Sequence, residues 1–494
     1  MRKIILAALS ALSLSAQPIT NAQTHGERMA AEYFRRQTAR IAARTLADVH
    51  TLADWQARRA TYRQQLLEML GLSPLPARGD LKATLTGKVE TEKFTVEKIH
   101  FQSLPGLYVT ANLYLPKKLD GLAPAVLYLC GHLRTVKDGI AYGTKVGYRH
   151  HLITEGPHSD TQDLQVPAFR WLNRWLKKDT GLLSEPALKR FEIEQLKVFT
   201  SLPADQINTR IHDTFVPAAP PAALPSTRQE WQSLAARWSA ALREKIFNNW
   251  PETDPRPAVK VLSDLTHNGA RARLVEFQPD DAYRLQLALL THARQTPTKL
   301  AVSVLDEEQL RRWAAVGGRY FPDLFASENN DGAAEADWLK PLQEGTAIAL
   351  VLPRGVGPTA WRKEKDIHIR RRFLLLGQSL ETMQVWDTRA ALSALRSFPP
   401  LDRLPVTLRG ARTMSVVALF AALFEDSVKS LELERLPSTL ANGPSFPNAL
   451  RFFDLPQLVA MALPRSVNLT GADPGDWEWS LKTAKLMEGT ISVR

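Results

Sequence analysis

The sequence predicts an α/β protein built on a doubly wound, mainly parallel sheet. Between Ala272 and Leu469, short apolar runs of strand length alternate with segments of helical period, as in sheets covered by helices on both faces. Three further strand-like runs lie between Leu81 and Leu115. We therefore expect one nearly complete sheet domain, a partial second unit before it, and an N-terminal helical segment.

The N-terminus has the features of a secretory signal. Met1-Arg2-Lys3 precedes the apolar run from Ile4 to Leu14, and Thr20-Asn21-Ala22 supplies small residues for cleavage. An uncleaved amphipathic helix is the alternative. We expect a signal peptide over residues 1–22 and a secreted or periplasmic protein. No later segment has the roughly twenty apolar residues that a membrane span needs.

The composition argues against a disulfide-stabilised protein and against a nucleic-acid-binding protein. The chain has 494 residues, 44% of them hydrophobic, and one cysteine, Cys130, so its stability must come from packed cores without disulfides. Cys130 closes an apolar run and is predicted to be a buried strand residue; a reactive thiol is the alternative. The net charge of +12 could suggest nucleic-acid binding, but the basic residues are interspersed with acids. The triplet Arg370-Arg371-Arg372 is predicted to be an exposed helix start.

The first part of the chain divides into three segments. Residues 23–80 are mainly helical, from Glu27 to Leu72, and end at Gly71 and nearby prolines. Residues 81–180 form the partial unit, and residues 181–259 form a helical and proline-rich connector with a boundary near Val216. The expected elements are strands Leu81–Val89, Phe94–Phe101, Leu107–Leu115 and Ala125–Cys130, and helices Leu188–Phe199 and Trp231–Phe247.

Residues 260–494 form the second unit, in which strands and helices alternate. The expected strands are Ala272–Phe277, Arg284–Thr291, Leu300–Leu305, Ala347–Leu352, Val406–Leu408, Ser430–Leu433 and Ser466–Leu469. The expected helices are Glu308–Ala315, Leu380–Ser397, Ser415–Phe424, Leu455–Leu463 and Trp477–Leu486.

Several short motifs in the first unit carry a family resemblance. They are Tyr114-Leu115-Pro116, Cys130-Gly131-His132, Tyr148-Arg149-His150-His151, Gly156-Pro157-His158-Ser159-Asp160-Thr161-Gln162 and Pro167-Ala168-Phe169-Arg170-Trp171-Leu172-Asn173. With these the chain resembles secreted bacterial acetylxylan-esterase-like proteins of the α/β-hydrolase superfamily that carry two hydrolase domains in tandem. The resemblance implies deacylation of acetylated polysaccharide or small carboxylic esters, without a cofactor.

The resemblance also implies that much of the first domain is missing. In the family, the chain after the paired histidines continues through the middle strands, the nucleophile and the acid. Here His151 is followed directly by Leu152. A natural deletion and a gene-model artefact both account for this gap.

The first unit retains three candidate residues by resemblance. His158 matches the catalytic base, and Gly131 with His132 matches the oxyanion loop. A histidine base acts only with a proton donor in hydrogen-bond reach, and this unit offers no obvious one. His158 is therefore either a base or the remnant of one.

The second unit has a nucleophile elbow in which arginine replaces the nucleophile. Such elbows follow the pattern G-x-S-x-G between a strand and a helix, and no complete example occurs in the chain. The segment at the elbow position is Gly410-Ala411-Arg412-Thr413-Met414. Arg412 is protonated at any ordinary pH and cannot attack an acyl carbon. We expect this elbow to be inactive; Thr413 and Ser415 are more typical of helix caps than of nucleophiles.

Ser379 and Asp473 are the remaining triad candidates. Ser379 follows Gly377 and Gln378 but lacks the closing glycine, and a structural serine is the alternative to a nucleophile. Asp473 follows a predicted strand where a triad acid would lie, although a carboxylate without partners at such a position is more often a helix cap. No histidine occurs beyond His368, so the second unit lacks a base in the expected order.

The spacing of the histidines and the turn after the strand Ala347–Leu352 argue against a metal site and a phosphate-binding loop. His132, His150, His151 and His158 with Asp160 or Asp163 match no compact metal-ligand motif, and no metal site is predicted. The turn from Arg354 to Pro358 lacks the lysine of a phosphate loop and resembles a structural turn of the hydrolases.

The sequence thus predicts a hydrolase-superfamily protein with weak or no esterase activity. The alternative function is a non-catalytic glycan-binding or scaffold protein on the same fold. The expected partners are an acetylated polysaccharide or a small ester, and neither nucleic acid nor a membrane span is expected.

Overall fold

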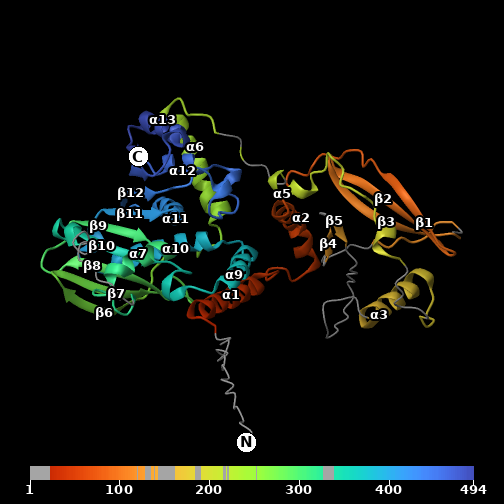
Figure 1. Cartoon of the computed structure of the whole chain (residues 1–494), viewed down its shortest axis with the longest axis horizontal. Coiled ribbons are helices and arrows are strands. Elements are labelled where there is room, and N and C mark those ends of the chain that lie inside the picture. Colours follow the sequence, from red (N-terminus) through yellow and green to blue (C-terminus); the bar gives the residue numbers. More distant parts are fainter. Residues whose placement is uncertain are drawn as a thin grey trace, which may run out of the picture. The chain divides into compact units, whose positions relative to one another are not determined.

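The chain folds into two compact units (Figure 1). The computed structural model describes residues 23–118, 121–127, 135–137, 140–142, 162–183, 191–214, 219, 222–251, 253–325 and 339–494. The larger unit combines residues up to Val49 with residues from 218 onwards, and the smaller unit comprises residues 50–217. The segment 23–80, treated as one piece in the sequence analysis, is thus divided after Val49.

The larger unit contains a nine-stranded sheet with the order β14-β13-β12-β11-β9-β10-β8-β7-β6. The strands from β10 through β9 and β11 to β14 are parallel, whereas β6, β7 and β8 form an antiparallel edge. The strands are β6 (Val259–His267), β7 (Ala270–Phe277), β8 (Leu285–His292), β9 (Lys299–Val304), β10 (Thr346–Leu352), β11 (Val406–Ala411), β12 (Val428–Glu434), β13 (Ser466–Thr470) and β14 (Ile491–Val493). The prediction of a mainly parallel sheet is confirmed.

Alternation along the strands sends side chains to two separate cores. Leu287 and Leu289 of β8 belong to the larger core, whereas Ala288 and Leu290 belong to the smaller one. Leu310 and Trp313 of α7 pack against the smaller core. The helices of this unit are α1 (His25–Arg44), α6 (Arg228–Ala241), α7 (Glu307–Gly317), α9 (Lys363–Leu375), α10 (Leu380–Leu395), α11 (Thr413–Ala422), α12 (Leu455–Met461) and α13 (Glu478–Met487). The sheet is therefore covered by helices on both faces, as the sequence predicts.

The predicted elements of the larger unit are present within a few residues, but β6, β14 and α9 were not predicted from the sequence. Strands β6 and β14 lie at the two edges of the sheet, and α9 precedes α10. The triplet Arg370-Arg371-Arg372 lies in the second half of α9, not at a helix start. The helix begins earlier, at Lys363, where Glu364 and Asp366 supply the acidic first turn that favours a helix N-terminus.

The smaller unit contains the antiparallel sheet β1-β2-β3, which confirms three predicted strands. Its elements are α2 (Leu52–Met69), β1 (Thr84–Glu90), β2 (Phe94–Leu104), β3 (Leu107–Pro116), β4 (Thr135–Lys137), β5 (Ile140–Tyr142), α3 (Gln162–Leu172), α4 (Ile193–Leu196) and α5 (Ile211–Thr214). Within the described residues 191–199 of the predicted helix Leu188–Phe199, the single turn α4 is formed. The strand expected over Ala125–Cys130 is wrong for residues 125–127, which form no strand and leave Val126 and Leu127 exposed. An apolar run forms a strand only where another strand pairs with it; Cys130 lies outside the described residues.

Helix α1 packs against segments of the larger unit that lie far from it in the sequence. Tyr33 and Phe34 are buried against Phe373 of α9, with ring centroids 5.6 and 4.9 Å from that ring. At the start of the helix, Thr24 Oγ1 donates to Ala360 O at 3.0 Å, and Glu27 accepts a bidentate pair from Arg362 at 2.7 and 2.8 Å. The hydrogen bond from Arg362 lowers the pKa of Glu27 from 4.5 to about 2.

The ion pair of Glu27 with Arg362 predicts an acid-sensitive contribution to the stability of the fold. Because the folded-state pKa of Glu27 is depressed, the carboxylate stabilises the fold above pH 4.5, and this contribution disappears as pH falls towards 2. We expect Glu27→Gln to lower the free energy of unfolding at pH 7 and to approach the wild type below pH 3. Urea denaturation at pH 7, 5, 4 and 3 measures this, with exposed Glu364→Gln on α9 as the control. A gap between Glu27→Gln and wild type that is constant across this range would contradict the assignment.

Candidate functional site

The candidate site lies at the carboxyl ends of β9 and β11, where the sequence predicts the nucleophile elbow. β11 ends at Ala411 and α11 begins at Thr413, so Arg412 alone makes the turn, with φ 54° and ψ −120°. Positive φ strains a residue with a side chain. A Cβ on Gly410 would lie 2.2 Å from Met414 O, so only glycine allows the helix to start this close to the strand. The sharp turn of a nucleophile elbow is thus present, and its tip is an arginine.

The Arg412 side chain is held by two carboxylates. Its Nη2 lies 2.7 Å from Asp306 Oδ2 and 3.0 Å from Glu308 Oε2. The hydrogen bond to Asp306 raises the pKa of Arg412 above its ordinary value. The guanidinium is therefore a permanent cation, fixed by charge-assisted hydrogen bonds.

Asp306 belongs to the loop between β9 and α7. Counted from β7, β9 is the third strand in the chain, and the loop after the third strand of such enzymes provides an oxyanion-binding N–H. Here Asp306 caps α7: its Oδ1 accepts from Gln309 N at 2.8 Å, and its own N–H donates to Gln309 Oε1 at 3.2 Å. The N–H is thus already used within the capping box, and Asp306 presents a carboxylate to the site.

Glu307 and Glu308 continue this acidic turn. Glu307 Oε1 accepts from Gly357 N at 2.6 Å, which ties the loop to the turn after β10. Negative charge at this position disfavours a developing oxyanion, which needs donors around it. The geometry therefore shows an arginine at the elbow that is paired with two carboxylates of the β9–α7 loop.

Ser379 caps a helix. Its Oγ accepts from Thr382 N at 3.0 Å, and its N–H donates to Thr382 Oγ1 at 2.9 Å, which forms a capping box at the start of α10. Its φ of −126° is ordinary extended backbone. The hydroxyl is used by its own helix, which favours the structural alternative for Ser379.

Asp473 also caps a local turn. It follows β13, is exposed, and accepts from Gly475 N at 2.9 Å at the start of the turn Pro474–Trp477. Among the contacts of the described residues, none joins Asp473 to Arg412 or to Ser379. The three candidates in the larger unit therefore occupy separate local structures.

The candidates of the smaller unit lie outside the described residues. This holds for His158, for Gly131 and His132, and for the other histidines of the proposed metal alternative. Within the part of the chain that the structure describes, no group of three or more His, Cys, Asp or Glu residues is arranged to hold a metal ion.

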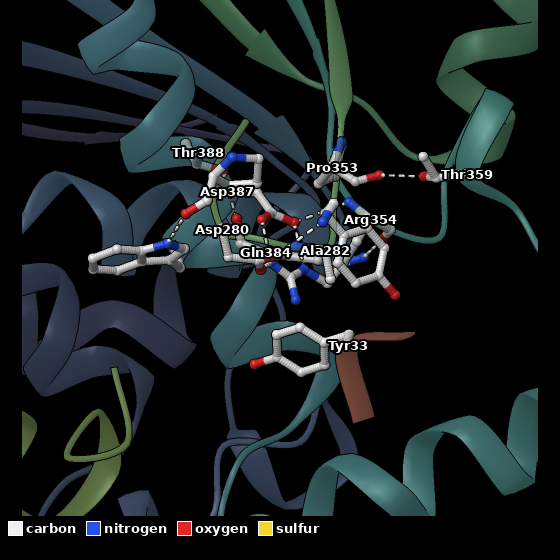
Figure 2. A network of polar contacts seen from close by, with 12 residues as sticks. Tyr33, Asp280, Ala282, Pro353, Arg354, Thr359, Gln384, Asp387 and Thr388 are labelled. Atoms are coloured by element: carbon white, nitrogen blue, oxygen red, sulfur yellow. Dashed lines mark hydrogen bonds and ion pairs between the residues drawn. The ribbon is translucent and has the colours of Figure 1, made fainter. Parts of the chain in front are cut away.

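The larger unit also contains a buried ionic network around Arg354 (Figure 2), of which the sequence indicated only the turn that carries Arg354. Arg354 follows β10 and is fully buried. Its Nε and Nη2 lie 2.9 and 2.7 Å from the two oxygens of Asp387 on α10, and Nη2 also lies 2.9 Å from Asp280 Oδ2. Burial alone lowers the pKa of an arginine, but these two carboxylates more than reverse that effect and raise the pKa of Arg354 well above its ordinary value.

Two aromatic rings complete the network. The guanidinium carbon of Arg354 lies 4.3 Å from the ring centroid of Tyr283 and 5.0 Å from that of Tyr33 on α1. Tyr33 OH donates to Gln378 Oε1 at 2.8 Å. The network therefore joins the β7–β8 loop, the end of β10, α10 and α1 around one cation, which is a structural use of the turn after β10. The available sequence signal was an arginine in the turn after a predicted strand and an aspartate in the middle of a predicted helix, with nothing local to pair them.

Comparison with known proteins gives solved structures only. Neither the family models nor the curated proteins contain a match. A candidate acetyl xylan esterase from Bacteroides fragilis is 17% identical, with a TM-score of 0.44, over 54% of this chain and 75% of its own. A glucuronoyl esterase from Solibacter usitatus is 14% identical, with a TM-score of 0.41, over 56% and 94%. A glucuronoyl esterase from Teredinibacter turnerae is 15% identical, with a TM-score of 0.36, over 54% and 76%.

All three proteins are esterases by name, and each match covers about half of this chain. The fold assignment rests on the chain's own hydrogen-bond pattern. An antiparallel edge is followed by parallel strands. β10 lies between β8 and β9, so that β9 and β10 are reversed in the sheet relative to their order in the chain, and a strained turn connects β11 to α11. The larger unit of this protein has an α/β-hydrolase-like fold.

Proposed function

We propose that this protein uses a hydrolase-like fold for carbohydrate binding and does not hydrolyse esters at the elbow of its larger unit. The observation that carries the proposal is the fixed ion pair of Arg412 with Asp306 and Glu308. An acyl-transfer site needs a nucleophile at the elbow and hydrogen-bond donors for the oxyanion. A guanidinium cannot act as the nucleophile, and the loop that would supply the hydrogen-bond donors presents carboxylates to Arg412.

The expected location supports a carbohydrate partner. The N-terminal residues have the composition of a secretory signal, and we propose that the protein acts outside the cytoplasm. No helix among the described residues is long and apolar enough to cross a membrane. The acetylated polysaccharide implied by the family resemblance remains the proposed ligand class, with cleavage replaced by binding.

An esterase assay tests the loss of catalysis. We expect the mature full-length protein to hydrolyse 4-nitrophenyl acetate and acetylated xylan no faster than its Arg412→Ala variant, because an arginine is not a nucleophile. The Ser379→Ala and His158→Ala variants should have the same background rate. Thermal unfolding of each variant establishes that it is folded, since loss of the Ser379 cap lowers stability by about 1 kcal/mol.

One result would overturn this proposal. Turnover well above the buffer rate that is abolished in a folded His158→Ala or Ser379→Ala variant would show an active hydrolase. Activity lost with His158 would place catalysis in the smaller unit, and activity lost with Ser379 would place it at the start of α10.

A further inference from the structure

The smaller unit carries an exposed aromatic and basic surface that the elbow does not involve. We call it the tryptophan patch; its residues are Arg170, Trp171, Arg174, Trp175, Lys177 and Lys178. Trp171 and Trp175 are 44% and 52% exposed, which is unusual for the largest apolar side chain. Their ring centroids lie 6.5 Å apart, so the two indoles form one surface.

The local backbone produces this surface. α3 ends at Leu172 and continues as a π-helical turn over Asn173–Lys177, and Lys178 closes it with φ 59° and an N–H bond to Asn173 O. Residues four apart lie on the same side of a helix, so Trp171 and Trp175 are neighbours. π-helical turns are rare and occur frequently at functional sites.

Among the residues that the structure describes, no acidic side chain pairs with the four basic residues of the patch. Arg170, Arg174, Lys177 and Lys178 are exposed, and the segment Arg170–Lys178 contains no Asp or Glu. Within the described part of the smaller unit, none of their side chains forms an ion pair. The nearest acid in sequence, Asp179, accepts from Gly181 N at 2.8 Å. The patch therefore presents four uncompensated positive charges, which attract a polyanion.

Cations and rings are mixed within this surface. The Arg174 guanidinium carbon and the Lys178 Nζ lie 5.5 and 5.9 Å from the Trp175 ring centroid. A helix that lies in a membrane surface separates an apolar stripe from its charges, and here insertion of the Trp175 ring would desolvate two cations. A chain of sugar rings can stack on the indoles while its carboxylates meet the adjacent cations.

We propose that the tryptophan patch binds an acidic polysaccharide, with pyranose rings on Trp171 and Trp175 and uronate carboxylates paired to Arg174 and Lys178. This inference rests on the proposed binding function and names its site and the charge of its ligand. The contacts are exposed, so binding should weaken strongly with ionic strength as the Debye length falls.

Calorimetric titration with polygalacturonate tests the proposal on the mature full-length protein. We expect Trp175→Ala and the double variant Arg174→Gln with Lys178→Gln each to weaken binding at least about fivefold, the size of roughly 1 kcal/mol. A matched control is Lys299→Gln with Lys429→Gln, which removes the same charge from exposed positions of the larger unit and should bind as the wild type does. Neutral unsubstituted xylan should bind far more weakly than polygalacturonate.

Three results would overturn the proposal. An equal loss in the Lys299 and Lys429 control would show that binding follows net charge. Tighter binding to vesicles of phosphatidylglycerol and phosphatidylcholine, or to duplex DNA, would assign the patch to a membrane or a nucleic acid. The esterase assay on the same samples separates the two proposals, because a protein that cleaves esters and still binds polygalacturonate through the patch contradicts only the first.

Discussion

Replacement of Asp387 by Asn should destabilise the larger unit by about 3–5 kcal/mol, the usual cost of breaking a buried ion pair. Arg354 and Asp387 are both fully buried. The variant would leave a buried guanidinium with Asp280 as its single carboxylate partner. Guanidinium chloride denaturation followed by tryptophan fluorescence measures the effect, because Trp386 lies next to Asp387 on α10 and is itself buried.

The exposed pair of Arg271 with Asp264 provides a matched control. It has the same bidentate geometry, with distances of 2.9 and 2.6 Å, but its side chains are 49% and 37% exposed. Asp264→Asn should cost less than about 1 kcal/mol. The double variant Arg354→Met with Asp387→Asn should cost less than the sum of the single variants, since both remove the same interaction. Equal effects of Asp387→Asn and Asp264→Asn would contradict the structural importance of the network.

Replacement of Gly26 by Ala should displace α1 from the larger unit. A Cβ at this position would lie 2.0 Å from Thr359 O and 2.6 Å from Ala360 O, and both are backbone atoms that cannot rotate away. Forced overpacking of this kind costs about 1–3 kcal/mol, and occasionally more. The buried side chains Tyr33 and Phe34 would also lose contacts as the helix moves.

Limited proteolysis and chemical denaturation together measure this effect. The Gly26→Ala variant should be cleaved faster between α1 and α2 and should unfold at a lower denaturant concentration than the wild type. Gly79→Ala is the control, because a Cβ there meets nothing within 4 Å. If the Gly26→Ala variant is cleaved and denatured as the wild type is, the packing of α1 does not depend on this close approach.

Short-range patterns in the sequence were sufficient to predict most elements of the larger sheet. Alternation of apolar residues and the spacing of helical faces are encoded within a few neighbouring residues. Arg412 could be assigned to the turn between β11 and α11 for the same reason, since Gly410 and the flanking apolar runs are local. Edge strands such as β14, with three residues, carry too short a pattern for such an analysis.

The partners of the candidate residues could not be derived in this way. Arg412 pairs with Asp306, 106 positions away, and Arg354 pairs with Asp280, 74 positions away. An ion pair of this kind depends on which strands become neighbours in the sheet, and no local period specifies that order. The sequence therefore indicated that the elbow lacks a nucleophile. The structure alone showed that carboxylates at the start of α7 pair with the arginine at the elbow.

The sequence by itself determined the α/β class, the elements of the parallel sheet and the arginine at its elbow, because each follows from local periodicity and turn chemistry. The tertiary structure alone decided that α1 belongs to a unit that resumes at residue 218, and that one buried arginine connects it to the sheet. Thr24 and Ala360 are joined by a hydrogen bond across 336 positions. Such contacts form because burial of apolar surface brings distant segments together, and the free energy of that burial depends on the whole packed core.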